Sequence, residues 1–334
     1  MKPSVCVAGN IVVDRLYPIC GYPPRGELTQ ICDGISLSSG GAVCNTGMDI
    51  AALLPDASVL AAGMVGRDAD GDFAIRQMTE RGMDCSRVRR ASLPTAFTAV
   101  MNDLGSGERT FFTYAGANRE FSRNSVDLDG LGADLFHIGY ILLLDALDAP
   151  DAEYGTQMAH LLADVRARGI RTSVDVVSES GDRFARLVPP ALRYTDYCVI
   201  NEIEAAATTG IPLRDADGAL LLADVPRALE KLHELGVAEW AVIHSPEGGY
   251  GMDRNGGYFA ADSLRLPADF IQGKVGAGDA FCAGVLAGAV QGAPLSDAVR
   301  LGIATAAMSL SRPDATSGVG NADAAMALYR KFGG

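Results

Sequence analysis

A glycine-containing turn followed by an aspartate is the stretch of this sequence best suited to chemistry. Gly276, Ala277 and Gly278 come directly before Asp279, and a small, apolar segment follows to Val290. Glycine lets a ligand approach the backbone closely, and free N–H groups at a turn that leads into a helix bind anions. A carboxylate there suits a general base that takes a proton from a hydroxyl attacking a bound phosphate. The alternative is that Asp279 only caps the helix.

A second pair of candidates follows a strand predicted over residues 197–200. Asn201 and Glu204 fall on the first turn of the next helix and share a face, which suits holding the waters of a magnesium–nucleotide complex. The alternative is a helix carboxylate favoured by the dipole. Gly248 and Gly249 follow a later strand, where the choice is between a nucleotide-contacting loop and an ordinary turn.

Three further candidates lie near the start of the chain. An apolar strand is predicted from residue 5 up to Asp14, and open α/β sheets bind ligands at the carboxyl ends of their strands. Gly40 and Gly41 precede a predicted helix that carries Asn45 in its first turn. This glycine pair either lets a ligand come close or only makes a tight turn.

Composition excludes several classes of protein. The chain has 334 residues and a net charge of −13, which argues against nucleic acid or an anionic membrane as the main partner. No run approaches the ~20 apolar residues of a membrane span, and the first residues do not resemble a signal peptide. The seven cysteines include no C-x-x-C pair, so we expect a reducing, cytoplasmic environment.

Other catalytic signatures are missing from the sequence. It has no G-x-x-x-x-G-K-[ST] loop and no G-x-S-x-G elbow. No G-x-G-x-x-G follows the first strand, which leaves an NAD(P)-dependent oxidoreductase as a weak alternative. The four histidines are isolated from cysteine and carboxylate at metal-ligand spacing, so each is expected to be structural.

The order of predicted elements indicates an α/β fold. Strands and helices alternate from residue 135 onward, which predicts a mostly parallel sheet with helices on both faces. Two β-rich runs at 95–102 and 109–114 flank a polar, glycine-containing turn and predict a hairpin, and residues 28–37 read as another ribbon. These segments do not fit the alternation. We therefore expect a single domain over residues 1–334 with a small β lid, built within 12–37 and 95–117.

Taken in order, the motifs resemble the ribokinase-like carbohydrate kinases of the PfkB family. They are GGAVCN at 40–45, GAN at 116–118, N-x-x-E at 201–204 and GAGD at 276–279. The resemblance implies a three-layer ribokinase-like sandwich. It also implies a kinase that uses ATP and Mg²⁺ to phosphorylate a hydroxyl, expected to be a hydroxymethyl group, of a small sugar or sugar-like substrate.

The resemblance also implies roles for individual residues. Asp279 is the expected base. The expected anion hole comprises Gly276, Ala277 and Gly278, and the expected substrate site comprises Asp14, Gly40, Gly41, Asn45 and Asn118. The expected nucleotide site comprises Asn201, Glu204, Gly248 and Gly249. Glu204 is expected to contact Mg²⁺ through water. Lid hairpins in relatives often pair between subunits, which implies a homodimer.

One departure from the family pattern affects a further cofactor. Relatives usually read D-T-x-G-A-G-D, whereas this chain has Gly273, Lys274 and Val275 before the loop. The missing Asp and Thr sit where many members bind a monovalent cation, so we expect that ion to bind weakly. Two alternatives remain within the fold: a nucleoside kinase, and a sugar-binding protein with little turnover.

Overall fold

The computed structural model describes residues 2–106, 108–178 and 181–333. Among them, nine strands form a main sheet in the order β15-β14-β13-β12-β11-β8-β1-β4-β5, which is parallel except at β14 and β15. Its strands are β1 (Ser4–Gly9), β4 (Ser58–Val65), β5 (Asp84–Arg90), β8 (Leu135–Ile141), β11 (Arg171–Val176), β12 (Tyr197–Asn201), β13 (Trp240–Ser245), β14 (Gly248–Asp253) and β15 (Tyr258–Asp262). The fold is α/β with a mostly parallel central sheet, as predicted.

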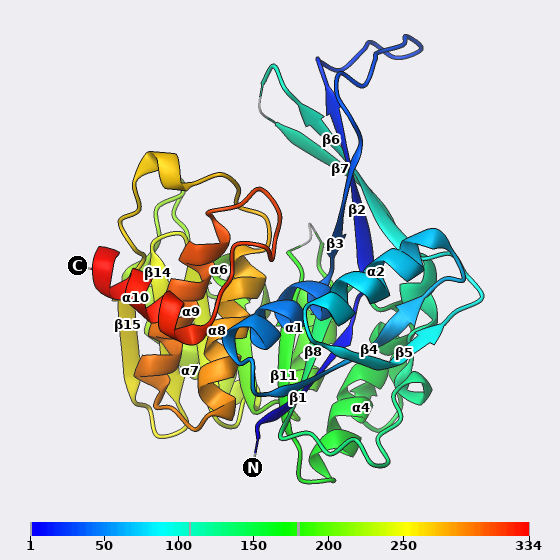
Figure 1. Cartoon of the computed structure of the whole chain (residues 1–334). Coiled ribbons are helices and arrows are strands. Elements are labelled where there is room, and N and C mark those ends of the chain that lie inside the picture. Colours follow the sequence, from blue (N-terminus) through cyan, green and yellow to red (C-terminus); the bar gives the residue numbers. More distant parts are fainter. Residues whose placement is uncertain (1, 107, 179–180, 334) are drawn as a thin grey trace.

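Helices cover both faces of this sheet and complete three layers (Figure 1). On one face, α1 (Ala42–Leu53), α8 (Ala277–Val290) and α9 (Leu295–Ser309) share a buried cluster with inward-facing strand residues such as Val7 and Val199. The other face packs on α4 (Gln157–Arg166), α5 (Phe184–Leu192) and α7 (Val225–Leu235). The remaining helices are α2 (Ala69–Glu80), α3 (Asp145–Asp148), α6 (Glu202–Thr209) and α10 (Ala322–Phe332). None of the described helices is long and apolar enough to cross a bilayer.

Small residues bring α8 and α9 close together. A Cβ at Gly284 would lie 2.7 Å from the carbonyl oxygen of Leu301, and a Cβ at Gly288 would lie 2.7 Å from the Cβ of Ala298. A helix that is apolar on all sides must be buried on all sides, and α8 is enclosed from Ala280 to Ala289. The helix that carries Asp279 is therefore held firmly against its neighbours.

Four strands form the lid, a separate sheet in the order β3-β2-β6-β7 that projects from the body of the molecule (Figure 1). They are β2 (Val12–Ile19), β3 (Ser36–Gly40), β6 (Ala96–Asp103) and β7 (Arg109–Tyr114). The predicted hairpin at 95–114 is confirmed as β6 and β7. In the other ribbon only β3 forms, because most of residues 20–35 are exposed and irregular.

The cysteines depart from expectation at the end of β2. A disulfide joins Cys20 to Cys32, whereas the other five cysteines are free thiols. The sequence predicted a reducing, cytoplasmic environment, in which disulfides are rare. The spacing of Cys20 and Cys32 gave no sign of a pair, because the two residues meet only when the intervening chain returns to β2, where Ile31 lies opposite Ile19 and the Cys32 N–H donates to the Pro18 carbonyl.

The first predicted strand also differs from the structure. It was expected to continue to Asp14, but β1 ends at Gly9, whose φ of 122° turns the chain out of the main sheet and into the lid. The segment before the glycine-containing turn of Gly276 is a short 3₁₀ turn, Ala268–Phe270, followed by irregular chain.

Candidate active site

Asp279 lies in the first turn of α8, and the cap of this helix is a glycine. Gly276 is the N-cap residue with φ of 77°, and no described side chain bonds to the helix's first N–H groups. A Cβ at Gly276 would lie 2.4 Å from the Cβ of Ala315, so both conformation and space require glycine there. The alternative that Asp279 only caps the helix is therefore wrong, and its carboxylate serves another purpose.

Three side chains donate hydrogen bonds to the Asp279 carboxylate. The Tyr140 hydroxyl donates to Oδ1 at 2.7 Å, the Thr46 hydroxyl to Oδ1 at 3.4 Å, and Asn45 Nδ2 to Oδ2 at 3.0 Å. Tyr140 comes from β8 and the other two from α1, so neighbouring elements fix the orientation of the carboxylate. A carboxylate offers about four lone-pair positions, which leaves one for a further donor such as a substrate hydroxyl.

Opposing effects act on the pKa of Asp279. Burial raises the pKa, while the hydrogen bonds from Tyr140, Asn45 and Thr46 lower it, and the net change is upward. A carboxylate with a raised pKa is a stronger base than an exposed aspartate. This environment therefore suits proton transfer from an alcohol.

The turn before Asp279 presents the positive end of α8. The first four N–H groups of a helix have no partner within it, and this 14-residue helix begins at Ala277. Gly278 lies against His244, since a Cβ there would lie 3.2 Å from Cε1 of that ring. Backbone donors and the helix dipole together favour an anion beside Asp279.

Asp14 approaches the same region from the lid. Burial raises its pKa to about 6, the Thr98 side chain lowers it by hydrogen bonding, and the negative charge of Asp279 raises it. Gly40 makes room for this carboxylate, since a Cβ at Gly40 would lie 2.6 Å from Asp14 Oδ2. The carboxylate of Asp14 on the lid strand β2 is therefore close enough to Asp279 on helix α8 to sense its charge.

Gly41 and Asn45 form the start of α1 beside this edge. Gly41 has φ of 83°, and a Cβ there would lie 2.6 Å from the carbonyl oxygen of Asn10. Asn45 is 6 % exposed and gives its Nδ2 to Asp279, whereas its buried Oδ1 has no partner among the described residues. That oxygen is an open hydrogen-bond acceptor next to the candidate base.

Asn118 holds the backbone between β1 and β2. Its Oδ1 accepts from the Ile11 N–H at 3.2 Å, and its Nδ2 donates to the Ile11 carbonyl at 3.2 Å. The side chain is 1 % exposed. A motif comparison does not reveal this structural role, and the expected substrate contact of Asn118 stays a prediction.

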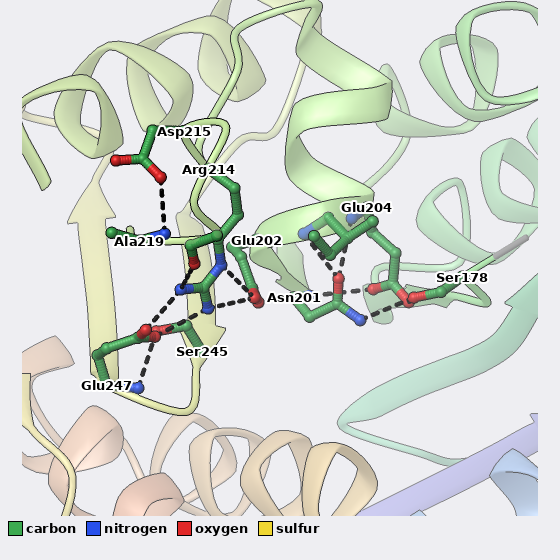
Figure 2. A network of polar contacts seen from close by, with 11 residues as sticks. Ser178, Asn201, Glu202, Glu204, Arg214, Asp215, Ala219, Ser245 and Glu247 are labelled. Atoms are coloured by element: carbon green, nitrogen blue, oxygen red, sulfur yellow. Dashed lines mark hydrogen bonds and ion pairs between the residues drawn. The ribbon is translucent and has the colours of Figure 1, made fainter. Parts of the chain in front are cut away.

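Asn201 and Glu204 form a capping box at the start of α6 (Figure 2). Asn201 Oδ1 accepts from the N–H groups of Ile203 and Glu204, while Glu204 Oε2 accepts from the N–H of Asn201 at 3.0 Å. Ser178 donates to Glu204 Oε1 at 2.8 Å. Burial raises the pKa of Glu204 to about 7, against the opposing effect of its hydrogen bonds. The two residues thus stabilise the start of α6, and they place the buried acid Glu204 at the carboxyl end of β12.

Arg214, which was not predicted from the sequence as a site residue, links α6 to the turn between β13 and β14. Arg214 donates through Nε and Nη2 to Glu202 Oε1, and through Nη1 and Nη2 to the two oxygens of Glu247 (Figure 2). Hydrogen bonds from Arg214 lower the pKa of Glu247 to about 2. The bridge pins the turn between β13 and β14 to the start of α6.

Gly248 and Gly249 belong to a β-strand and not to a loop. Both lie in β14, which pairs with β13 and β15. A Cβ at Gly248 would lie 2.4 Å from the carbonyl oxygen of Ala261, and one at Gly249 would lie 2.8 Å from the Phe281 ring. Close packing explains both glycines, and the expected nucleotide contact at these positions stays a prediction.

The sequence analysis missed two residues that bond to Asp279 and a third that senses its charge. Tyr140 and Thr46 carry no motif of their own and gain significance only by converging on Asp279. Asp175, at the end of β11, is 7 % exposed, and burial followed by the charges of Glu204 and Asp279 raises its pKa. Asp175 could have been predicted as a site residue from its place near the carboxyl end of a strand, because open α/β sheets bind ligands at the carboxyl ends of their strands.

Comparison with known proteins agrees with this geometry. A family model described as pfkB family carbohydrate kinase matches residues 2–321. The chain is 21 % identical to a ribokinase of Haemophilus influenzae over 96 % of both chains. It superposes on Arabidopsis thaliana ribokinase, complexed with ribose and ATP, with a TM-score of 0.81, 20 % identity and coverage of 98 % and 99 %. The Methanocaldococcus jannaschii nucleoside kinase gives a TM-score of 0.74 at 16 % identity, with 99 % of each chain covered.

The family model spans nearly the whole chain and includes both the lid and the turn that precedes Asp279. Members transfer a phosphoryl group to an alcohol, which is the chemistry that a buried carboxylate beside a helix N-terminus supports. The chain therefore belongs to the pfkB family of carbohydrate kinases.

Proposed function

We propose that this enzyme transfers the γ-phosphoryl group of ATP to a hydroxymethyl group of a small sugar or sugar-like substrate, with Asp279 as general base. The observation that carries the proposal is the oriented Asp279 carboxylate, held by Tyr140, Asn45 and Thr46 at the N-terminus of α8. In the reaction, Asp279 accepts the proton of the substrate hydroxyl. The hydroxyl oxygen then forms a bond to the γ-phosphorus, and ADP leaves.

The N–H groups at Gly276, Ala277 and Gly278 are proposed to face the charge that develops on the transferred phosphoryl group. They are fixed before the substrate arrives, because Gly276 packs on Ala315 and Gly278 on His244. Preorganised backbone donors of this kind stabilise a transition state without further rearrangement.

Asp14, Gly40, Gly41 and Asn45 are proposed to hold the substrate's other hydroxyls. Asp14 is partly buried with room made by Gly40, and Asn45 Oδ1 is an unused acceptor. Both accept hydrogen bonds from hydroxyls, so a polyhydroxy substrate suits this edge of the site.

Glu204 fits a magnesium ion bound through water. It is 4 % exposed, and the negative charge of Asp279 adds to burial in raising its pKa, so a nearby cation would relieve the local repulsion. Magnesium, when bound with ATP, neutralises phosphate charge and keeps several of its waters. Asn201 orients Glu204 through the capping box and is proposed to lie near the nucleotide.

We further propose one kinase domain with the lid as its cover, pairing with a second lid in a homodimer. On β7 the side chains of Phe111, Phe112 and Tyr114 are 62 %, 56 % and 37 % exposed, an apolar surface that a partner would bury. We place the enzyme in the cytoplasm with its ATP, where the Cys20–Cys32 bond at the lid tip would be reduced.

A substrate panel tests this function. Sugars, sugar acids, polyols and nucleosides are offered with ATP and Mg²⁺, ADP release is followed, and product phosphorylation is located by mass spectrometry. Turnover of a sugar above all nucleosides supports the proposal. Preference for nucleosides would favour the alternative activity, which the similarity to the nucleoside kinase makes worth including. Binding without turnover across the panel would contradict the assignment of a kinase.

A further inference from the structure

A buried polar cluster lies between the main sheet and α8, where the surroundings are otherwise apolar. It comprises His137 of β8, Asp175 of β11 and Cys282 of α8, which are 0 %, 7 % and 1 % exposed. One ligand atom from each lies within 4.8 Å of those of the other two. Around Cys282, α8 is built from small and apolar residues from Ala280 to Ala289. We call this set the His–Asp–Cys cluster; it takes no part in the proposed phosphoryl transfer.

His137 has one ring nitrogen without a partner. Its Nδ1 lies 3.1 Å from the Ser173 hydroxyl, whereas its Nε2 is buried with no hydrogen-bond partner among the described residues. A Cβ built on Gly139 would lie 3.8 Å from this Nε2 and 3.4 Å from the Asp175 Cβ, so the nitrogen borders the same space as Asp175. Buried polar atoms are rarely left unpaired, so this nitrogen is available to bind a ligand.

The donor set selects the kind of ligand. Imidazole nitrogen, thiolate sulfur and carboxylate oxygen together are typical of Zn²⁺ and unlike the all-oxygen environment of Mg²⁺. An ion central to three atoms within 4.8 Å of one another lies no more than about 2.8 Å from each, and small side-chain rotations shorten that to the ~2.0–2.3 Å of zinc ligation. The Ser173 hydroxyl on Nδ1 would orient the ring as an outer-shell partner.

Charge balance favours a divalent ion. Burial lowers the pKa of His137 to about 3 and raises the pKa of Cys282 and Asp175, so burial opposes a charge on each group unless a partner compensates for it. A divalent cation would displace the thiol and carboxyl protons, and the resulting two negative charges would cancel its own. The occupied site would therefore bury no net charge.

We propose that His137, Asp175 and Cys282 bind one Zn²⁺ ion, with water in the fourth position, behind the active site. Cys282 follows Asp279 by one helical turn on α8, so the ion ties the helix that carries the base to β8 and β11. Its role is to hold that helix end in place.

Cobalt provides a spectroscopic test, because Co²⁺ replaces Zn²⁺ and gives a charge-transfer absorption only when a thiolate is bound. The full chain is kept reduced with a phosphine, stripped with a chelator, and titrated with Co²⁺. Three variants accompany the wild type: Cys282→Ala removes the ligand, Ser173→Ala removes the outer-shell hydroxyl, and Cys198→Ala is the matched control. Cys198 is likewise fully buried, on β12, and lies outside the cluster.

We expect one Co²⁺ per chain with a thiolate band in the wild type and in Cys198→Ala, and no band in Cys282→Ala. Ser173→Ala should keep the band and bind the ion ~10–100-fold more weakly. Zn²⁺ should displace Co²⁺ and raise the melting temperature. A wild type without the band, or a band that persists in Cys282→Ala, would overturn the proposal. If Cys282→Ala does not fold, an unchanged affinity in Ser173→Ala would count against His137 as a ligand.

Discussion

Removing the Tyr140 hydroxyl should make the proposed base harder to ionise. Tyr140→Phe takes away one of three donors to Asp279, the shortest at 2.7 Å, and leaves Asn45 and Thr46 in place. A hydrogen bond to a charged group contributes about 1.5–3 kcal/mol, and 1.36 kcal/mol corresponds to one pKa unit, so the pKa of Asp279 should rise by about 1–2 units. The hydroxyl stabilises the ionised carboxylate of Asp279, so without it Asp279 becomes ionised only at higher pH.

The measurement is the pH dependence of kcat/KM for ADP release with the accepted substrate. In Tyr140→Phe the acid limb should move upward by about 1–2 pH units, with most activity recovered at high pH. Tyr154→Phe is the control, because the Tyr154 ring stacks on His160 and Tyr154 is not one of the three donors to Asp279. An acid limb that stays in place while the rate falls equally at every pH would refute the reasoning, since the hydroxyl would then act on geometry alone.

Three further outcomes are expected. Asp14→Ala should weaken sugar binding by about 1.5–3 kcal/mol for each hydroxyl bond lost. In the wild type, the affinity for the sugar should fall as the pH drops through about 6, where Asp14 takes up a proton. A calorimetric dissociation constant that the substitution leaves unchanged would show that Asp14 does not belong to the site. Wild-type activity in tetramethylammonium buffer should be nearly independent of added potassium, because Gly273 stands where relatives carry the Asp that helps to hold the ion. Lys274→Ala should be slower with ATP, because the Lys274 ammonium is expected to supply the missing positive charge. Strong activation of the wild type by potassium would contradict this. Asp49→Leu should raise the free energy of unfolding by about 1–3 kcal/mol near pH 7, because both carboxylate oxygens of Asp49 are buried without a described partner. The pKa of Asp49 is raised in the folded state, so the stability of the wild type falls as the pH rises above the pKa of this group in the unfolded chain. Urea titrations at several pH values that show no gain in stability would refute this prediction.

Local signals made part of the fold predictable. Helix α6 begins where predicted, because Asn201 and Glu204 cap its start, and the left-handed Gly210 ends it. The hairpin of β6 and β7 was equally clear from its polar, glycine-containing turn. These features depend on neighbours within a few residues, so a single sequence carries them.

Distant packing decided what the sequence did not show. Gly248 and Gly249 look like a loop in isolation, and only the approach of Ala261 and Phe281 explains glycine inside β14. Likewise, nothing near Tyr140 marks it as a partner of Asp279, because the two residues are 139 positions apart. The motif at 276–279 located the centre of the site, whereas its supporting contacts came from other elements.

The measurement closest to the central claim is the turnover of Asp279→Asn. Asparagine preserves the size of the side chain and its hydrogen bonding with Asn45, Thr46 and Tyr140 in part, but it accepts no proton from a hydroxyl. With the accepted sugar, ATP and Mg²⁺, kcat should fall by ~10²-fold or more, while the calorimetric dissociation constant of the sugar and the melting temperature stay close to wild type. A variant that folds, binds the sugar and retains about a quarter of wild-type kcat would contradict the assignment of Asp279 as the base.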